Sequence, residues 1–370
     1  MKIVIDRNIR GAESTFALHG DLVEMDGRDI RRHHLEDADI LVIRTATRAN
    51  AELLEGTAVR FVGTTSIGTD HLDIPWLEKQ GIAWSNAPGC NADSAAQYTL
   101  AMMWLACQRL DKDLKAQRVG IIGRGNVGSR VQKLLTALGV DNVANDPPLA
   151  DQGVNSLVPQ EEALQCDIVC LHVPLTTDGP YPTRSMIGMQ QLAKMPQGAL
   201  LLNSSRGNVV QGAALLEAVR GGSVHAALDV WPDEPLLSPE LLEHSVVATP
   251  HVAGYSDDGK RNGTWMVYEA FCKNAGIEPV ARGEQGQERL KLSIQNPETA
   301  LSEALEAACF VPGHDQALRA MARLPSAQIA QGFDRLRKEY PYRRDFHGWD
   351  VDCTDLTAAG TLSSLGFRLI

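Results

Sequence analysis

Short apolar segments alternate with amphipathic segments along most of the chain. From residue 118 onward, apolar runs of strand length occupy residues 119–123, 140–144, 167–173, 199–202, 225–230 and 245–248. Segments with helical spacing of apolar residues lie between most of these runs, as at residues 185–194 and 211–220. Strands that alternate with crossover helices predict a parallel, doubly wound α/β sheet.

The first part of the chain repeats this alternation on a smaller scale. Its short apolar runs fall at residues 2–6, 22–25, 39–43, 60–63 and 82–84. Two long helices, expected at residues 91–110 and 257–274, would carry the chain into the second α/β domain and back. The pattern therefore predicts an outer domain of residues 1–92 and 257–285, into which a domain of residues 93–256 is inserted.

The pattern changes after about Gly286. Strands are expected at residues 290–294, 349–351 and 367–370, and helices at residues 298–308, 316–322 and 327–338. These elements predict a small α+β domain over residues 286–370.

The apolar run at residues 119–123 continues into the pattern G-x-G-x-x-G and then into an amphipathic helix. Gly123 allows a tight turn, Gly125 lets a pyrophosphate approach the backbone, and Gly128 lets the helix pack closely on its strand. Asn126 and Val127 lie at the start of the helix, where free N–H groups favour phosphate. Strand, glycines and helix together predict a dinucleotide site.

Asp146 follows the next apolar segment, eighteen residues after Gly128. An acid at this place accepts hydrogen bonds from the ribose hydroxyls of the adenosine. Two prolines follow it instead of a lysine or arginine, so a phosphate on the ribose would be repelled. The sequence therefore predicts NAD and not NADP as the cofactor.

Composition excludes several other classes of protein. The net charge of −11 and the pI of about 5.4 argue against a nucleic-acid surface. No apolar run reaches the roughly 18 residues that a membrane span needs, and the N-terminus has the pattern of a strand and not of a signal peptide. The seven cysteines are scattered, and Cys166 and Cys170 flank an apolar strand, which favours packing over metal binding. We expect a reduced, cytoplasmic protein without a metal.

Residues of complementary chemistry follow the last three strands of the large sheet: Arg206, Glu234 and His251. Ligands of open parallel sheets bind beyond the carboxyl ends of the strands. An arginine there can hold a carboxylate bidentately, a histidine can take a hydroxyl proton as hydride leaves, and an acid can orient and support that histidine. The three residues therefore predict the oxidation of a 2-hydroxy acid. His71 is interpreted as a hydrogen-bonded packing group, and His172 as a residue that shapes the cofactor loop and does not transfer protons.

The glycine pattern and residues 203–207, 229–235 and 249–254 resemble the D-2-hydroxyacid dehydrogenase family, over roughly residues 1–285. The resemblance implies an α/β fold in which a Rossmann-type doubly wound sheet, binding NAD, is inserted in a flavodoxin-like substrate domain. It also implies the roles given above for Arg206, Glu234 and His251. By the same motif match, the cofactor site would be lined by Val173, Ser204, Ser205, Arg206, Asp229 and Gly254.

Residues 61–71, 87–92, 178–181, 251–256 and 333–344 are similar to one branch of this family. The likeness implies an enzyme of pyridoxal phosphate biosynthesis that oxidises 4-phospho-D-erythronate, and a homodimer joined by its C-terminal domain. It also implies that Thr45, Ser66 and Tyr255 contact the substrate. Thr45 and Ser66 stand where serine and threonine are usual, so the hydroxyls are kept. Val173 replaces a frequent threonine, which leaves only a backbone contact.

A phosphorylated hydroxy acid has two anionic ends, and Arg206 would hold one of them. Arg44 is a candidate for the phosphate. A further hypothesis is that Arg343 or Arg344 crosses the dimer interface and closes the partner's phosphate pocket; the alternative is a solvated basic turn.

Two other functions stay open at this point. The first is 3-phosphoglycerate dehydrogenase, although its common C-terminal module would be βαββαβ and the tail here is more helical. The second is an NAD-sensing binding protein on the same fold, such as a co-repressor.

Overall fold

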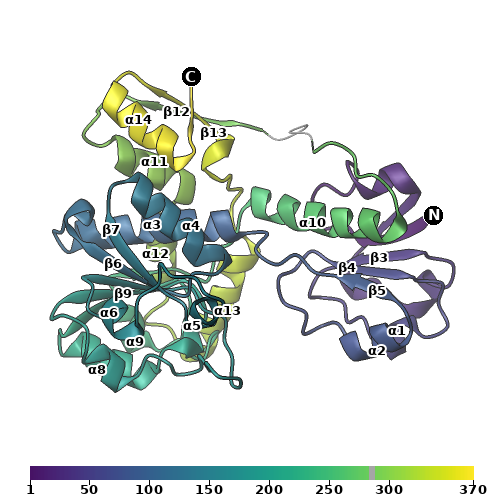
Figure 1. The fold of residues 1–370 in the computed structure, drawn as a ribbon, viewed down its shortest axis with the longest axis horizontal. Helices are drawn as coiled ribbons and strands as arrows, with labels where there is room; N and C mark the ends of the chain where they lie inside the picture. The colour runs from purple at the N-terminus through teal and green to yellow at the C-terminus, as the bar shows by residue number, and fades with distance from the viewer. Residues whose placement is uncertain (283–287) are drawn as a thin grey trace. The chain divides into compact units, whose positions relative to one another are not determined.

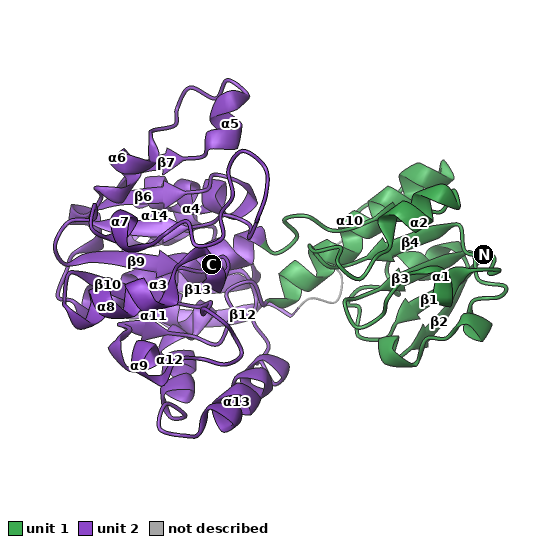
Figure 2. Ribbon diagram, turned by 90° about the horizontal axis from the view of Figure 1, so that it is seen from below, with its two compact units in different colours: residues 1–91, 256–287 green, residues 92–255, 288–370 purple. Residues whose placement is uncertain are grey.

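The computed structural model describes residues 1–282 and 288–370 and divides the chain into two compact units (Figure 1, Figure 2). Unit 1 comprises residues 1–91 and 256–287, and unit 2 comprises residues 92–255 and 288–370. The domain boundary expected at residues 285 and 286 lies outside the described residues. The tail belongs to unit 2 together with the large sheet, so its separation as a third domain stays a prediction.

Unit 1 is a parallel five-stranded sheet in the order β2-β1-β3-β4-β5, which is the flavodoxin-like order. The strands are β1 (Lys2–Asp6), β2 (Asp21–Met25), β3 (Ile40–Ile43), β4 (Phe61–Thr64) and β5 (Ala83–Ser85). The helix α10 (Asp257–Ala275) packs on one face, and α1 (Ala51–Leu54) and α2 (Ile74–Lys79) lie on the other (Figure 1). Three short 3₁₀ helices are η1 (Phe16–His19), η2 (Gly27–Asp29) and η3 (Arg32–His34).

Unit 2 contains a parallel six-stranded sheet in the order β11-β10-β9-β8-β6-β7. Its strands are β6 (Arg118–Ile122), β7 (Asp141–Asn145), β8 (Ile168–Leu171), β9 (Ala199–Asn203), β10 (Val224–Leu228) and β11 (Val247–Ala248). Apolar residues dominate β6, β8, β9, β10 and β11 because helices cover both faces, whereas the edge strand β7 is more polar. The direction of strand order changes between β6 and β8, and such a switch point is where α/β sheets bind ligands.

Helices lie on both faces of this sheet (Figure 1). The long helix α3 (Ala92–Arg109) and α4 (Asn126–Ala137) pack together on one face, and α6, α8 and α9 lie on the other. The remaining elements of this region are η4 (Leu114–Ala116), α5 (Pro147–Asp151), α6 (Gln160–Leu164), α7 (Met189–Leu192), η5 (Gly207–Val209), α8 (Gly212–Arg220) and α9 (Pro239–His244). The α/β architecture predicted from the alternation is confirmed.

The tail of unit 2 forms a parallel three-stranded sheet in the order β12-β13-β14. Its elements are β12 (Leu290–Ile294), α11 (Ala300–Cys309), α12 (Val311–Arg319), α13 (Ser326–Lys338), η6 (Phe346–Gly348), β13 (Trp349–Cys353), α14 (Leu356–Leu365) and β14 (Arg368–Leu369). The sequence pattern missed α14, whose Thr, Ser and Gly residues weaken helix propensity although Ala359, Leu362 and Leu365 are buried. The helix expected at residues 185–194 was wrong in extent, because only α7 is helical there.

The tail covers β11, the edge strand of the large sheet. The carboxylate of Asp315 accepts a hydrogen bond from the backbone N–H of Ala248, at 2.7 Å. The guanidinium of Arg319 donates to the carbonyls of Leu242, at 3.0 Å, and Ser245, at 2.5 Å. An edge strand otherwise presents unpaired backbone groups. The tail therefore completes the hydrogen bonding of the segment that leads to His251.

Candidate active site

The loop between β6 and α4 needs two of its three glycines for its own shape. Gly123 has a φ of +92°, and a Cβ there would lie 2.7 Å from the carbonyl oxygen of His172. A Cβ on Gly128 would lie 1.9 Å from the carbonyl oxygen of Gly123. A Cβ on Gly125 would meet nothing within 4 Å. The space over Gly125 is thus open in the protein, as the close approach of a pyrophosphate requires.

A cavity of about 450 Å³ opens beside this loop within unit 2. Its lining includes Gly123, Gly125, Asp146, His172 and Val173. Asn126 and Val127 form the first residues of α4 at the same loop. The glycine loop, the helix start and the acid fit a dinucleotide whose phosphates meet the loop and whose ribose meets the acid.

Asp146 also has a structural role that the sequence did not indicate. One of its carboxylate oxygens accepts from the backbone N–H of Arg124, at 2.8 Å, and the other accepts from the N–H of Leu149, at 3.1 Å. The second bond caps α5. Asp146 therefore ties the glycine loop to the end of β7, which fixes its position at the cavity.

His71 is buried and hydrogen-bonded, as expected for a packing group, and buried His172 lines the cavity beside the glycine loop. Burial lowers the pKa of His172 to about 3, so its imidazole stays neutral. His71 shares a hydrogen bond of 2.8 Å with the hydroxyl of Thr64, and burial also lowers its pKa. Neither histidine is suited to exchange protons near neutral pH.

The loop after β9 is held by its own polar side chains. Ser205 donates to the side-chain oxygen of Asn203 from its backbone N–H, at 3.0 Å, and from its hydroxyl, at 2.8 Å. Ser204 shares a hydrogen bond of 2.8 Å with Thr99. Arg206 is exposed, and its guanidinium donates to the carbonyl of Ser205 at 2.7 Å. Within the described ranges no acid lies at ion-pair distance from Arg206, so its charge is available to an anionic ligand.

His251 and Glu234 form a hydrogen-bonded pair. The Nδ1 atom of His251 donates to Oε1 of Glu234 at 2.5 Å, and both side chains are about one quarter exposed. The backbone N–H of Trp231 donates to the other carboxylate oxygen at 3.1 Å. His251 has a φ of +56°, an uncommon conformation for a residue with a side chain. Nδ1 is occupied by the acid, which leaves Nε2 to exchange a proton with a ligand.

The carboxyl group of Glu234 is held in its charged form. Burial is the largest single influence and raises its pKa. The hydrogen bond and charge of His251, the N–H of Trp231 and the charge of Arg337 lower it, and the net pKa lies below the ordinary value. A charged carboxylate at Nδ1 accepts the Nδ1–H bond and so fixes the orientation of the ring.

Asp229 organises the loop that carries His251. Its buried carboxylate accepts from the hydroxyl of Thr249, at 2.6 Å, and from the backbone N–H groups of Val252 and Ala253, both at 3.0 Å. The sequence analysis assigned Asp229 and Gly254 to the cofactor site. The loop contacts of Asp229 do not test that assignment, which stays a prediction. The sequence did not foresee the loop-holding contacts, because they join residues about twenty positions apart.

The predicted substrate residue Tyr255 lies against the tail of unit 2. Its ring packs edge-on against Tyr340, with centroids 5.4 Å apart. The guanidinium of Arg337, on α13, lies 6.0 Å from the centroid of the Tyr255 ring. The sequence did not single out Arg337; only its place within the tail segment 333–344 could have drawn attention to it.

The other predicted substrate residues belong to unit 1. Arg44 forms an ion pair with the fully buried carboxylate of Asp6, at 2.9 Å. Thr45 is exposed after β3, and Ser66 is half-buried after β4. The pairing with Asp6 offsets the charge of Arg44, which makes it a weaker candidate for a phosphate than the sequence suggested.

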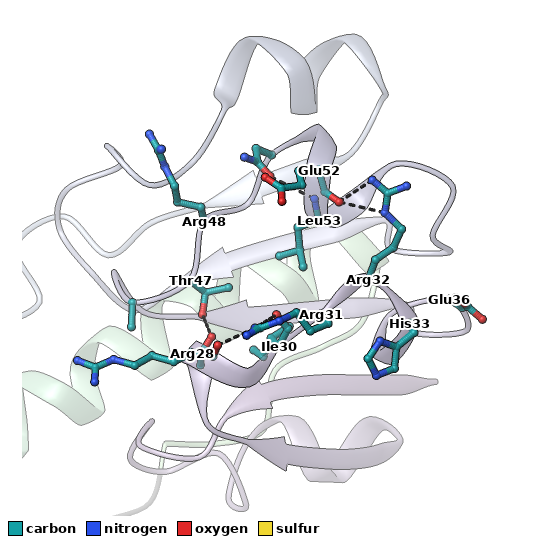
Figure 3. A pocket seen from close by; sticks show the side chains of 13 residues that line it. Arg28, Ile30, Arg31, Arg32, His33, Glu36, Thr47, Arg48, Glu52 and Leu53 are labelled. Atoms are coloured by element: carbon teal, nitrogen blue, oxygen red, sulfur yellow. Dashed lines mark hydrogen bonds between the residues drawn. The ribbon is translucent and has the colours of Figure 1, made fainter.

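Unit 1 also holds a basic cavity of about 670 Å³ that the sequence did not predict (Figure 3). Its lining includes Arg28, Arg31, Arg32, His33 and Arg48. Arg31 and Arg32 donate to backbone carbonyls. These basic residues come from the segments that follow β2 and β3.

The hypothesis that Arg343 or Arg344 reaches a partner's phosphate pocket is wrong for this structure. Arg343 is 5% exposed and donates to the carbonyls of Ala253, at 3.0 Å, and Ser94, at 2.5 Å. Arg344 is 2% exposed and donates to the carbonyl of Glu288. The segment was judged too polar for a core, but backbone carbonyls bond its guanidinium groups and permit their burial.

The described residues contain neither a candidate metal cluster nor a helix that could span a membrane. No cluster of three or more His, Cys, Asp or Glu side chains that could hold a metal ion occurs among residues 1–282 and 288–370. Over the same part of the chain, every helix is too short or too polar to cross a membrane.

Family models match two parts of the chain. The NAD binding domain of D-isomer specific 2-hydroxyacid dehydrogenases matches residues 91–253, and a domain of unknown function matches residues 286–366.

Full-length relatives are similar to the whole chain. The erythronate-4-phosphate dehydrogenase of Cellvibrio japonicus is 41% identical, and the alignment covers 100% of both chains. The enzyme of the same name from Hahella chejuensis is 40% identical over 100% of this chain and 99% of its own.

Solved structures share the fold over three quarters of the chain. The TT0316 protein from Thermus thermophilus is 25% identical, with a TM-score of 0.62, over 76% of this chain and 100% of its own. The NAD⁺-bound 3-phosphoglycerate dehydrogenase of Entamoeba histolytica is 23% identical, with a TM-score of 0.61, over 76% of this chain and 99% of its own.

Proposed function

The chain belongs to the erythronate-4-phosphate dehydrogenases, within the D-isomer specific 2-hydroxyacid dehydrogenase family, and on that premise we propose that it oxidises 4-phospho-D-erythronate with NAD. The product is (R)-3-hydroxy-2-oxo-4-phosphooxybutanoate, an intermediate of pyridoxal phosphate biosynthesis. The observation that carries the proposal is the hydrogen-bonded pair of His251 and Glu234, together with Arg206, whose charge no described acid neutralises.

The three side chains divide the work on the substrate. Arg206 holds the carboxylate through two parallel hydrogen bonds and so fixes the orientation of C2. Nε2 of His251 takes the proton of the C2 hydroxyl while the C2 hydrogen leaves as hydride, and a C=O bond forms. Glu234 holds Nδ1–H and stabilises the imidazolium that results. In the reverse direction His251 returns the proton.

The cofactor supplies the acceptor for that hydride. Gly123, Gly125 and Gly128 would place the loop and the start of α4 against its phosphates, where Asn126 and Val127 offer N–H groups. Asp146 would accept from the ribose. We assign the rest of the cofactor site to Val173, Ser204, Ser205, Arg206, Asp229 and Gly254.

On the substrate side, the proposal keeps Thr45, Ser66 and Tyr255 as contacts, with Arg44 as a secondary cation. It also makes the protein a cytoplasmic homodimer joined through residues 286–370. Sedimentation of the full chain and of a chain that ends before residue 286 tests this assembly. A full chain that sediments as a monomer at micromolar concentration would contradict the proposed homodimer.

The function is tested by following reduced cofactor with a panel of acids: 4-phospho-D-erythronate, D-erythronate, 3-phosphoglycerate and D-lactate. We expect kcat/KM to be highest for 4-phospho-D-erythronate by tenfold or more. A preference for 3-phosphoglycerate would identify a different dehydrogenase. Binding of NAD without turnover of any acid would favour a sensor of the cofactor.

A further inference from the structure

Arg337, on α13, lies against Tyr255 in the loop that carries His251. Its guanidinium is 6.0 Å from the centroid of the Tyr255 ring and 5.7 Å from that of the Phe333 ring. Its positive charge acts on the carboxyl group of Glu234, whose pKa it helps to lower. Tyr255 comes four residues after His251 in the same loop. All these residues belong to unit 2, so one compact unit brings this arginine to the reacting side chains.

The charge of Arg337 is poorly neutralised. Among the described residues, the acid at ion-pair distance is Asp334, at 3.9 Å, with a side chain that is 65% exposed. Nε of Arg337 is buried without a hydrogen-bond partner, although the side chain as a whole is 30% exposed. Arg319 and Arg343 of the same tail have two or more backbone carbonyls each. Arg337 therefore keeps unused donors and remains partly open to solvent.

We propose that Arg337 is the residue that binds the phosphate of the substrate. The inference rests on the proposed function, because it needs a substrate with two anionic ends. Arg206 holds the carboxylate, and Arg343 and Arg344 are buried against backbone carbonyls. In the described part of unit 2, Arg337 is the tail guanidinium that lies against the His251 loop, through Tyr255, and has only an exposed acid at 3.9 Å. A guanidinium binds phosphate through several charge-assisted hydrogen bonds.

The aromatic rings favour this use of Arg337. Contacts with Tyr255 and Phe333 hold the planar guanidinium, so less rotamer freedom is lost when a ligand binds. The helix α13 (Figure 2) lies within residues 286–366, which match a different family model from that of the NAD binding domain. The tail thus contributes a selectivity residue to a reaction whose catalytic groups, Arg206, Glu234 and His251, come from the NAD binding domain.

Substrates with and without the phosphate distinguish phosphate binding by Arg337 from an indirect effect of its charge on Glu234. Arg337→Met should lower kcat/KM for 4-phospho-D-erythronate by about 10- to 100-fold, the range for a charge-assisted hydrogen bond. It should change kcat/KM for D-erythronate less than threefold. Arg337→Lys should fall between Met and wild type for the phosphorylated acid, because it keeps the charge and loses the fork. Arg335→Met is the matched control, since Arg335 is exposed on the same helix, and it should behave as wild type.

Equal losses on both acids would overturn the proposal, since Arg337 would then act through Glu234. Unchanged kinetics on both acids would overturn it as well. Binding of inorganic phosphate to the NAD-loaded protein, followed by calorimetry, gives a readout that does not need turnover. Loss of a phosphate site in Arg337→Met but not in Arg48→Met supports the inference even if the wild type turns over a different acid. An intact site in Arg337→Met contradicts it.

Discussion

At the scale of single residues, the hydrogen bond between His251 and Glu234 should influence how kcat/KM depends on pH. The carboxyl group of Glu234 has a lowered pKa, so it is charged through the neutral range and favours the imidazolium. In Glu234→Gln the rise of kcat/KM with pH should move to lower pH, because the negative charge beside the base is lost. Profiles of kcat/KM against pH for the two proteins measure the displacement. Superimposable profiles would show that Glu234 does not act on His251.

Arg343 illustrates a residue whose importance is structural. Arg343→Met removes the hydrogen bonds that this guanidinium donates to the carbonyls of Ala253 and Ser94 and leaves the space of a buried charged group poorly filled, which should lower the free energy of unfolding by about 2–4 kcal/mol. The KM for the phosphorylated acid should change less than threefold in the protein that folds. Urea unfolding and steady-state kinetics test both statements, with the exposed Arg368→Met as the control. A tenfold rise in KM at unchanged stability would restore a phosphate-binding role for Arg343.

At the scale of elements, two glycines of one loop serve different purposes. Gly128→Ala should destabilise unit 2, because its Cβ would meet the carbonyl of Gly123 at 1.9 Å. Gly125→Ala has open space and a φ of −71°, so its stability should match the wild type while NAD binding weakens by tenfold or more. Thermal unfolding and NAD titration of the two variants give the comparison. Equal effects of both substitutions on stability would contradict this account of the loop.

The same elements show what a sequence can and cannot predict. Apolar runs located all eleven strands of the two larger sheets, because a buried parallel strand needs apolar residues on both faces. The glycine pattern, Asp146 and the residues after β9, β10 and β11 could be predicted since strand ends converge. The burial of Arg343 and the place of Arg337 could not, because both depend on the docking of a distant tail. The edge contact of Asp315 with β11 escaped prediction for the same reason.

At the scale of the whole molecule, buried histidines make stability depend on pH, and the pKa shifts are largest for His172 and His314. Burial lowers the pKa of His172 to about 3; burial, and then the charge of Arg343, lower that of His314 to about 4. The unfolded chain binds more protons than the folded one below about pH 6.5, so stability falls as pH drops from there toward 4. Each histidine adds a slope of up to about 1.4 kcal/mol per pH unit.

Urea unfolding at a series of pH values tests this dependence. His314→Gln should reduce the slope between about pH 6 and 4, and His33→Gln, at an exposed position, should leave it unchanged. An unaltered slope in His314→Gln would mean that this histidine is protonated in the folded protein.

The central claim is that C2 of the substrate gives its hydrogen to the cofactor as hydride while His251 takes the proton. The most direct test mixes the protein, loaded with one equivalent of NAD, with 4-phospho-D-erythronate deuterated at C2, and then weighs the extracted cofactor by mass spectrometry. We expect one deuterium in the reduced cofactor, and formation about 10² to 10⁴ times slower in His251→Gln. Reduced cofactor without deuterium, or an unchanged rate in His251→Gln, would contradict the account.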